Sequence, residues 1–158
     1  MHRITTTRRT TARATPAAAF DRFVHLELAD IMRGFGPLAA VSGTSGQTGP
    51  WDRAGSERLI HTDDGHAVRQ RVLRCERPRR FRYRIDRFPA PIDRLVEEAI
   101  SEWRFDATDG HTRIEWTYTY CTRGLLATVI LLPIVKLLWA GYMSRIIAAV
   151  RRTCEAPG

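Results

Sequence analysis

The sequence predicts an α+β fold in which one antiparallel sheet is covered by a long C-terminal helix. Two patterns lead to this prediction. Through the middle of the chain, short segments alternate apolar and polar residues, and tight-turn signals separate them. This is typical of antiparallel strands with one buried face. After residue 124, apolar residues recur at helical spacing. A sheet with one apolar face needs such a helix to bury that face.

Length and composition fit one domain. The chain has 158 residues, of which 44% are apolar and 27% charged, and a domain of this size buries roughly 70% of its unfolded surface. We expect one domain over residues 1–154 and a disordered tail over residues 155–158.

The N-terminus lacks the apolar segment of a secretory signal. The three cysteines are too widely spaced for a disulfide framework, so we expect a cytoplasmic protein with reduced thiols.

The first elements follow from threonine, proline and glycine positions. Residues 3–13 are rich in threonine, whose branched side chain favours a strand. Thr15 is a good N-cap and Pro16 a good first helical residue, so a short helix follows the strand. A second short helix is predicted between residues 30 and 36, where glycines and a proline end it.

The remaining strands are predicted from alternation and turns. The glycine-rich region 38–55 holds one strand and a loop. Asp-Gly pairs at 64–65 and 109–110 mark tight hairpins. Alternation is clearest around Tyr83 and Trp116, where aromatic residues take one face and charged residues the other. The strands predicted after residue 56 are 57–62, 67–75, 80–87, 96–106 and 112–120.

The positive charge does not by itself identify a partner. The net charge is +8, and Lys136 is the only lysine. A basic protein attracts nucleic acid, anionic lipid or acidic ligands. Here the arginines alternate with aromatic residues along predicted strands, so they form the solvated face of the sheet. The sequence has no zinc-finger spacing and no basic recognition helix, and we expect no nucleic-acid partner.

The most apolar segment lies near the C-terminus. Residues 125–142 nearly reach the length of a membrane-spanning helix, but Pro133 and Lys136 interrupt them. We predict a core helix over residues 133–153, with Pro133 as its first residue and 125–131 as a separate short segment. Its predicted buried stripe consists of Leu132, Val135, Trp139, Met143, Ile146 and Val150.

The opposite side of the same segment is also apolar. One sheet cannot bury both sides of a helix, so this second surface needs another role. The alternatives are a homodimer interface, a lid over a cavity and a peripheral membrane contact. The residues that would form it are Leu126, Ile130, Ile134 and Leu137.

No sequence motif indicates a particular reaction. Nucleophile elbows, phosphate-binding loops and zinc-protease motifs are absent from the sequence. None of the five histidines has a partner at a spacing that convincingly indicates a metal site. We therefore expect no metal and no cofactor.

Seven segments carry a resemblance to a known superfamily: 14–20, 51–58, 64–65, 78–85, 103–105, 109–116 and 139–143. Together they resemble the START-like superfamily, also called SRPBCC, of polyketide cyclase/dehydrase and lipid-transport-like proteins. The resemblance covers nearly the whole chain. It implies the Bet v 1-like helix-grip fold: a curved seven-stranded antiparallel sheet wrapped around a long C-terminal helix, with two short helices after the first strand.

The resemblance also implies a cavity between sheet and helix that takes apolar or aromatic small molecules. Strand and helix phase then predicts which side chains face it. These are Tyr83, Ile85, Trp103, Phe105, Ile114, Trp116, Tyr118, Val135, Trp139 and Met143. Each of them has core packing as an alternative role.

One departure from the family pattern concerns Arg58 and Gln70. Relatives often carry a glutamate near position 70. A glutamine beside Arg58 suits a ligand carboxylate or carbonyl better than an acid–base step, provided that the hairpin register directs both side chains inward.

Three functions stay open: a ligand carrier or sensor, a cyclase or aromatase, and a protein- or membrane-interaction module. An enzyme of this fold would orient its substrate with polar groups such as Tyr83, Tyr118, Arg58 and His61.

Overall fold

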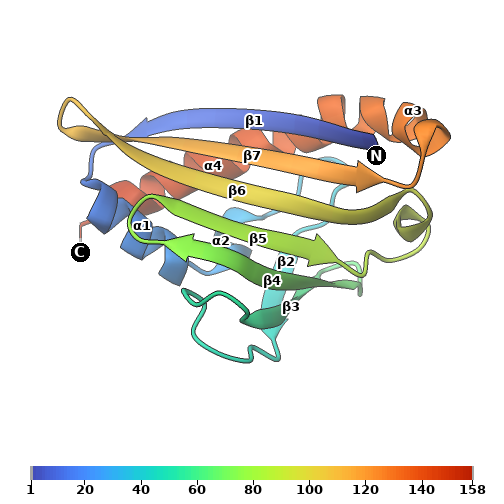
Figure 1. Ribbon diagram of the computed structural model, residues 1–158, viewed down its shortest axis with the longest axis horizontal. Helices are drawn as coiled ribbons and strands as arrows, with labels where there is room; N and C mark the ends of the chain where they lie inside the picture. Colours follow the sequence, from blue (N-terminus) through green and yellow to red (C-terminus); the bar gives the residue numbers. More distant parts are fainter. Residues whose placement is uncertain (1, 158) are drawn as a thin grey trace.

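A computed structural model describes residues 2–157 as a curved seven-stranded antiparallel sheet around a long C-terminal helix (Figure 1). The strand order is β1-β7-β6-β5-β4-β3-β2. The predicted α+β helix-grip fold is thus confirmed. The strands are β1 (His2–Ala12), β2 (Val41–Ser45), β3 (Glu57–Thr62), β4 (Ala67–Glu76), β5 (Arg80–Asp86), β6 (Val96–Thr108) and β7 (His111–Thr122).

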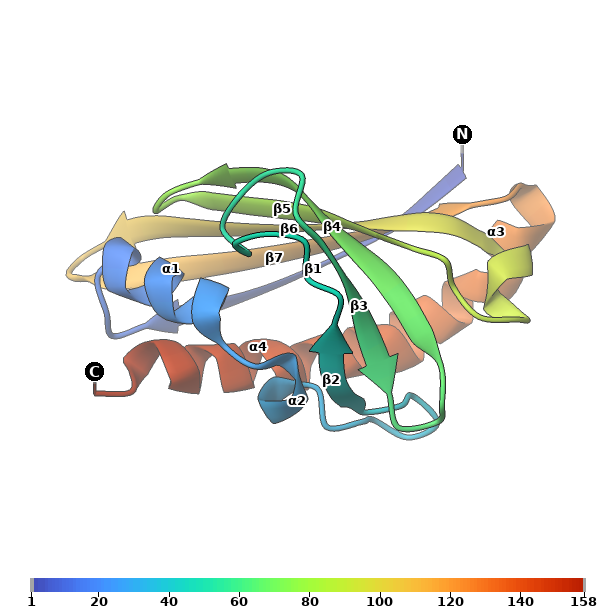
Figure 2. The same ribbon diagram turned by 90° about the horizontal axis from the view of Figure 1, so that it is seen from below.

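Two short helices follow β1, as predicted. In α1 (Pro16–His25), the Thr15 side chain accepts a hydrogen bond from the backbone N–H of Ala18 at 3.2 Å, which satisfies one of the free donors of the first turn. The second helix, α2 (Leu28–Ile31), is shorter and begins earlier than predicted. Figure 2 shows α1 between the sheet and the C-terminal end of the last helix.

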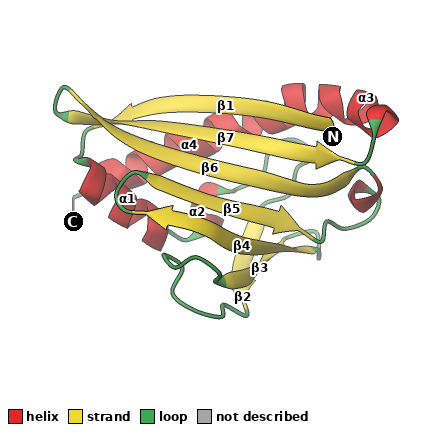
Figure 3. Cartoon of the chain, viewed as in Figure 1, coloured by secondary structure: helices red, strands yellow, loops and turns green. Residues whose placement is uncertain are grey.

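The C-terminal helical segment is continuous from Leu125 to Glu155. It consists of α3 (Leu125–Pro133), a π-helical stretch η2 (Ile134–Trp139) and α4 (Ala140–Glu155). The prediction that Pro133 begins this helix is therefore wrong, because Pro133 is the last residue of α3. Figure 3 shows the three parts as one helix alongside the sheet.

The π-helical stretch also explains why one residue of the predicted buried stripe is exposed. Leu131 is buried, whereas Leu132, which was predicted for the buried stripe, is 44% exposed. A π turn rotates less per residue than an α turn, so Leu131 comes onto the side of Trp139 instead. The other members of the predicted stripe are partly or fully buried: Val135, Trp139, Met143, Ile146 and Val150.

The helix also extends past the predicted domain boundary at residue 154. Glu155 is its last residue, and the Glu155 carboxylate accepts a hydrogen bond from the backbone N–H of Arg13 at 2.8 Å. Glu155 therefore belongs to the folded domain rather than to a tail.

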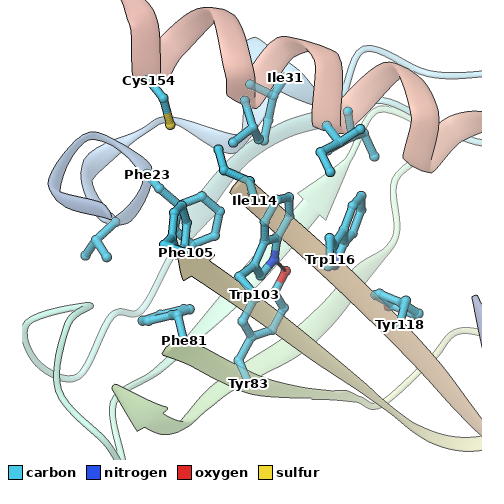
Figure 4. Close-up of a cluster of buried hydrophobic side chains, with 14 of the residues drawn as sticks. Phe23, Ile31, Phe81, Tyr83, Trp103, Phe105, Ile114, Trp116, Tyr118 and Cys154 are labelled. Carbon is cyan, nitrogen blue, oxygen red and sulfur yellow. Dashed lines mark hydrogen bonds between the residues drawn. The ribbon is translucent and has the colours of Figure 1, made fainter. Parts of the chain in front are cut away.

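The core occupies one end of the space between sheet and helix. Aromatic rings from α1 and from β5, β6 and β7 fill it at the C-terminal end of α4 (Figure 4). Phe20 and Phe105 meet edge to face with ring centroids 5.3 Å apart, and the rings of Phe23 and Trp103 lie 4.6 Å apart. At the opposite end a smaller cluster contains Ile4, Val96, Leu131 and Val135.

The arginines on the outer face of the sheet pair with acidic side chains, as their alternation suggested. The Arg69 guanidinium donates to both carboxylate oxygens of Asp86, at 2.7 and 2.6 Å. Arg9 donates to Glu115 at 2.7 Å. These ion pairs lie on the solvated face of the sheet.

Candidate ligand-binding cavity

A cavity of about 280 Å³ lies between the inner face of the sheet and the C-terminal helical segment. It occupies the end of the interior that α1 does not fill. Most of its walls are aromatic and aliphatic side chains from β2 to β7, α2 and the helix. Seven of the residues predicted for the site line it: Gln70, Tyr83, Ile85, Trp116, Tyr118, Val135 and Trp139.

Trp139 forms the centre of the helix-side wall. Its ring lies 4.8 Å from that of Tyr118 and 5.7 Å from that of Tyr142, centroid to centroid. Its buried indole Nε1 has no hydrogen-bond partner among the described residues. Alternation along β7 places Trp116, Tyr118 and Tyr120 on the same inner face, so the helix and the strand together build an aromatic wall.

The mouth of the cavity lies between two loops and the helix. The β3–β4 turn contributes Asp64 and His66, both exposed, and the connection from β5 to β6 contributes Phe88 and Pro89. Ile134, on η2, lines the cavity and is 37% exposed. Ile134 therefore lies both at the protein surface and on the cavity wall.

The tyrosine hydroxyls inside the cavity are neutral groups. Burial raises the pKa of Tyr83 and Tyr120, and it raises the pKa of Tyr118 well above its usual range. They offer hydrogen bonds to a ligand but do not supply a base near neutral pH. The hydroxyl of Tyr142 has a structural role, because it accepts from the backbone N–H of Gly34 and donates to a backbone carbonyl.

A second, smaller pocket of about 30 Å³ adjoins the cavity and contains Arg58. Arg58 and Gln70 are direct neighbours across β3 and β4, and Arg58 Nε donates to Gln70 Oε1 at 2.7 Å. The guanidinium also lies 3.8 Å from the ring centroid of Trp51. Burial lowers the pKa of Arg58 to about 10. The hairpin register thus brings the Arg58–Gln70 pair together in the interior.

Five predicted residues do not line the main cavity, and one of these, Arg58, lines the small pocket instead. Phe105, Ile114 and Met143 are fully buried in the core, and the prediction that they face the cavity is wrong. Trp103 lines only the small pocket. The reason is the position of α1, whose Phe20 and Phe23 fill the space under this end of β5 to β7.

Several lining residues were not predicted. Tyr120 has the same phase as Tyr118 and could have been included from alternation alone. The others come from loops and short elements whose position the sequence does not reveal. The principal additions are Met32, Val41, Ile60, Val68, Phe88, Tyr120, Leu131, Ile134 and Tyr142.

Within residues 2–157 no three His, Cys, Asp or Glu side chains gather in a way that could hold a metal ion. The cysteines of this part of the chain, Cys75, Cys121 and Cys154, are free thiols.

The fold and the cavity define a class of protein. A curved antiparallel sheet that surrounds a long C-terminal helix, with an apolar cavity between them, is the architecture of the START-like or SRPBCC proteins. The family described as polyketide cyclase / dehydrase and lipid transport matches residues 1–155. The chain belongs to this family.

Solved structures share the fold at low sequence identity. Truncated norcoclaurine synthase from Thalictrum flavum is similar with a TM-score of 0.73 and 11% identity, over 99% of this chain and 96% of that one. Ara h 8.0201 gives a TM-score of 0.63 and 17% identity, over 94% and 98% of the two chains.

A two-domain relative matches over half its length. The di-domain ARO/CYC protein BexL, from the BE-7585A biosynthetic pathway, gives a TM-score of 0.71 and 15% identity. The match covers 99% of this chain and 51% of BexL. At these identities the similarities show the fold alone. Comparison with curated proteins gives no match.

Proposed function

We propose that the protein binds a hydrophobic or aromatic small molecule, lipid-like or polyketide-like, and acts as a carrier or sensor. The observation that supports this proposal is the cavity of about 280 Å³ with its aromatic and aliphatic walls. Such walls, with a few polar groups among them, are typical of small-molecule sites. The family, which includes lipid transport in its description, agrees with this function.

The ionisable groups favour a carrier over an enzyme. A general acid–base mechanism needs groups inside the cavity whose pKa values are tuned towards neutrality. Among the described lining residues, burial instead moves the pKa values of Tyr83, Tyr118 and Tyr120 upward, away from neutrality. Asp64 and His66 lie exposed at the mouth. A cyclase or aromatase would have to act mainly by orienting its substrate.

Two alanine variants test the proposal with a fluorescent fatty acid. Trp139→Ala removes the helix-side aromatic wall and should weaken binding by about ten-fold or more. Phe105→Ala is the matched control, because Phe105 packs in the core and does not line the cavity. It should lower stability and leave the affinity within about two-fold. Unchanged affinity in a folded Trp139→Ala variant would contradict the proposed site.

An exposed apolar surface favours a second, compatible function. The first part of the C-terminal helical segment presents large apolar side chains to solvent. They include the four residues predicted for the opposite side of the helix: Leu126, Ile130, Ile134 and Leu137. Leu126 is 73% and Leu137 is 74% exposed. By length and composition alone, Leu125–Glu155 could cross a membrane, but α4 packs in the domain core. We call the exposed surface the apolar face: Leu125, Leu126, Val129, Ile130, Leu132, Ile134 and Leu137.

We propose that the apolar face docks on an anionic membrane surface. Residues 123–137, which hold the apolar face, include no acidic residue and two basic ones, Arg123 and Lys136. This charge suits anionic lipid, whereas a second copy would bring the same cations together. Ile134 belongs to both the apolar face and the cavity mouth, so a docked protein could take its ligand from the bilayer.

Vesicle flotation tests the membrane contact. The protein should float with vesicles that contain anionic lipid and much less with purely zwitterionic ones. A Leu126→Gln/Leu137→Gln variant should lose flotation, while Leu73→Gln, at an exposed leucine of β4, should retain it. No flotation of the native protein, together with a dimer that the double variant dissociates, would replace this proposal by a homodimer interface.

A further inference from the structure

Arg58 is the one charged side chain that lines the small pocket beside the cavity. Its Nε–H is used by Gln70, and its guanidinium lies over the ring of Trp51. No acidic side chain of residues 2–157 lies within ion-pair distance of it. A guanidinium carries five N–H donors, so most of the donors of Arg58 are left without an acceptor from the described chain.

This contrasts with arginines on the outer face of the same sheet. Arg69 pairs with Asp86 at 2.6 Å and Arg9 with Glu115 at 2.7 Å. The side chains of Arg69 and Arg9 are 25% and 55% exposed, and each has an acidic partner. Arg58 lies where burial lowers its pKa to about 10, yet its cross-strand neighbour is the neutral amide Gln70. Arg58 is half-buried, and a cation partly removed from water gains from a hydrogen-bonded anion.

The side chains around Arg58 do not supply that anion. Tyr83 lines the same pocket, but its raised pKa keeps the phenol protonated near neutral pH. Trp51 offers only its ring face. Glu27 raises the pKa of Arg58 only through its longer-range charge. No described side chain around the small pocket supplies the negative partner, and a bound acid would do so.

The small pocket is placed to receive one end of a ligand in the cavity. The small pocket and the cavity share five lining residues: Leu28, Met32, Gln70, Tyr83 and Trp116. A space of about 30 Å³ takes one compact polar group and no second ring. Resting on the proposed function, we infer that the ligand is an apolar acid whose carboxylate pairs with Arg58 while its apolar body fills the cavity.

A pair of ligands that differ only in the head group tests this inference. Dodecanoate and dodecanol are titrated against the native protein near neutral pH, by competition with a fluorescent apolar dye. The acid should bind about ten-fold or more tightly than the alcohol. Arg58→Met should remove that preference by weakening acid binding, with alcohol binding kept within about two-fold. Arg69→Met, which removes a cation on the outer face, is the matched control and should preserve the preference.

A second variant places an anionic side chain of the protein itself beside Arg58. Gln70→Glu places a carboxylate beside Arg58, so it should weaken dodecanoate much more than dodecanol, and this comparison stands even if Arg58→Met folds poorly. Equal binding of acid and alcohol to the native protein, with no selective effect of Gln70→Glu, would overturn the inference but leave the cavity function standing. Failure of both ligands to displace the dye from the native protein would overturn the inference and contradict the proposed function as well.

Discussion

Trp103 and Trp116 lie directly opposite each other on β6 and β7 and stack with ring centroids 4.5 Å apart and planes 13° apart. Trp116 Nε1 donates to Ser101 Oγ at 2.8 Å, and Trp103 Nε1 donates to the Tyr83 hydroxyl at 3.4 Å. Trp116 lines the cavity, whereas Trp103 faces the small pocket and the core. The stacked pair thus marks the border between the packed and the hollow halves of the interior.

Removing the core-side member of this pair should cost stability. Trp103 is almost fully buried and contacts Phe23 as well as Trp116. Trp103→Ala should therefore lower the free energy of unfolding by about 3–5 kcal/mol. Urea unfolding followed by circular dichroism measures this change. A loss below about 1 kcal/mol would mean that the pair does not support the core as described.

The four tyrosines should resist ionisation in the folded protein. Burial raises the pKa of Tyr83, Tyr118, Tyr120 and Tyr142 above the ordinary value of 10.0. A raised folded-state pKa means that stability is present below the unfolded-state pKa and is lost as pH rises above it.

Alkaline titration followed by tyrosinate absorbance, with circular dichroism in parallel, checks this prediction. The tyrosinate signal should appear together with unfolding rather than before it. A signal that reaches its full amplitude near pH 10 while the protein stays folded would show that the tyrosines are accessible to water.

The ion pair between Arg69 and Asp86 should stabilise the folded protein by an amount that depends on pH in the acid range. Hydrogen bonds from Arg69 lower the pKa of Asp86 below its ordinary value of 3.8. A carboxyl with a lowered folded-state pKa stabilises the fold above its unfolded-state pKa and loses this effect as pH falls through its folded-state pKa. Asp86→Asn should therefore destabilise the protein at neutral pH, on the order of 1 kcal/mol for a partly exposed pair.

Thermal unfolding at a series of pH values measures this contribution. The difference between native protein and Asp86→Asn should be constant above about pH 5 and should shrink below about pH 4. Asp106→Asn, at an exposed aspartate of β6, is the control and should show little difference. If the difference in thermal stability between the native protein and Asp86→Asn stays constant down to the pH of acid unfolding, the stabilisation does not come from the charge of the Asp86 carboxylate.

The fold could be predicted from the sequence because alternation and turn chemistry are local. The phase of Tyr83 and Trp116 identified the inner face of their strands, and Asp-Gly pairs identified two hairpins. Register needs more than local pattern: the sequence left open whether Arg58 and Gln70 face inward, and the pairing of β3 with β4 places them opposite each other. Pro133 misled the helix prediction because a π-helical stretch after it keeps the helix continuous.

The site could be predicted only in part because alternation identifies an inner face but not which part of it is hollow. Phe105 and Tyr118 have equivalent phases on neighbouring strands, but α1 packs over Phe105 and leaves space beside Tyr118. That difference depends on where a helix distant in sequence lies. Residues such as Met32 and Phe88 enter the site from loops, for which periodicity gives no phase.

Native mass spectrometry of freshly purified protein tests the central claim most directly. The account predicts a folded species that carries the extra mass of a small apolar molecule, and a bare chain after denaturation. Refolded, emptied protein should then take up one equivalent of a fluorescent fatty acid. A folded monomer that carries no extra mass and takes up no fatty acid or apolar dye after refolding would contradict the proposal that the cavity is a ligand-binding site.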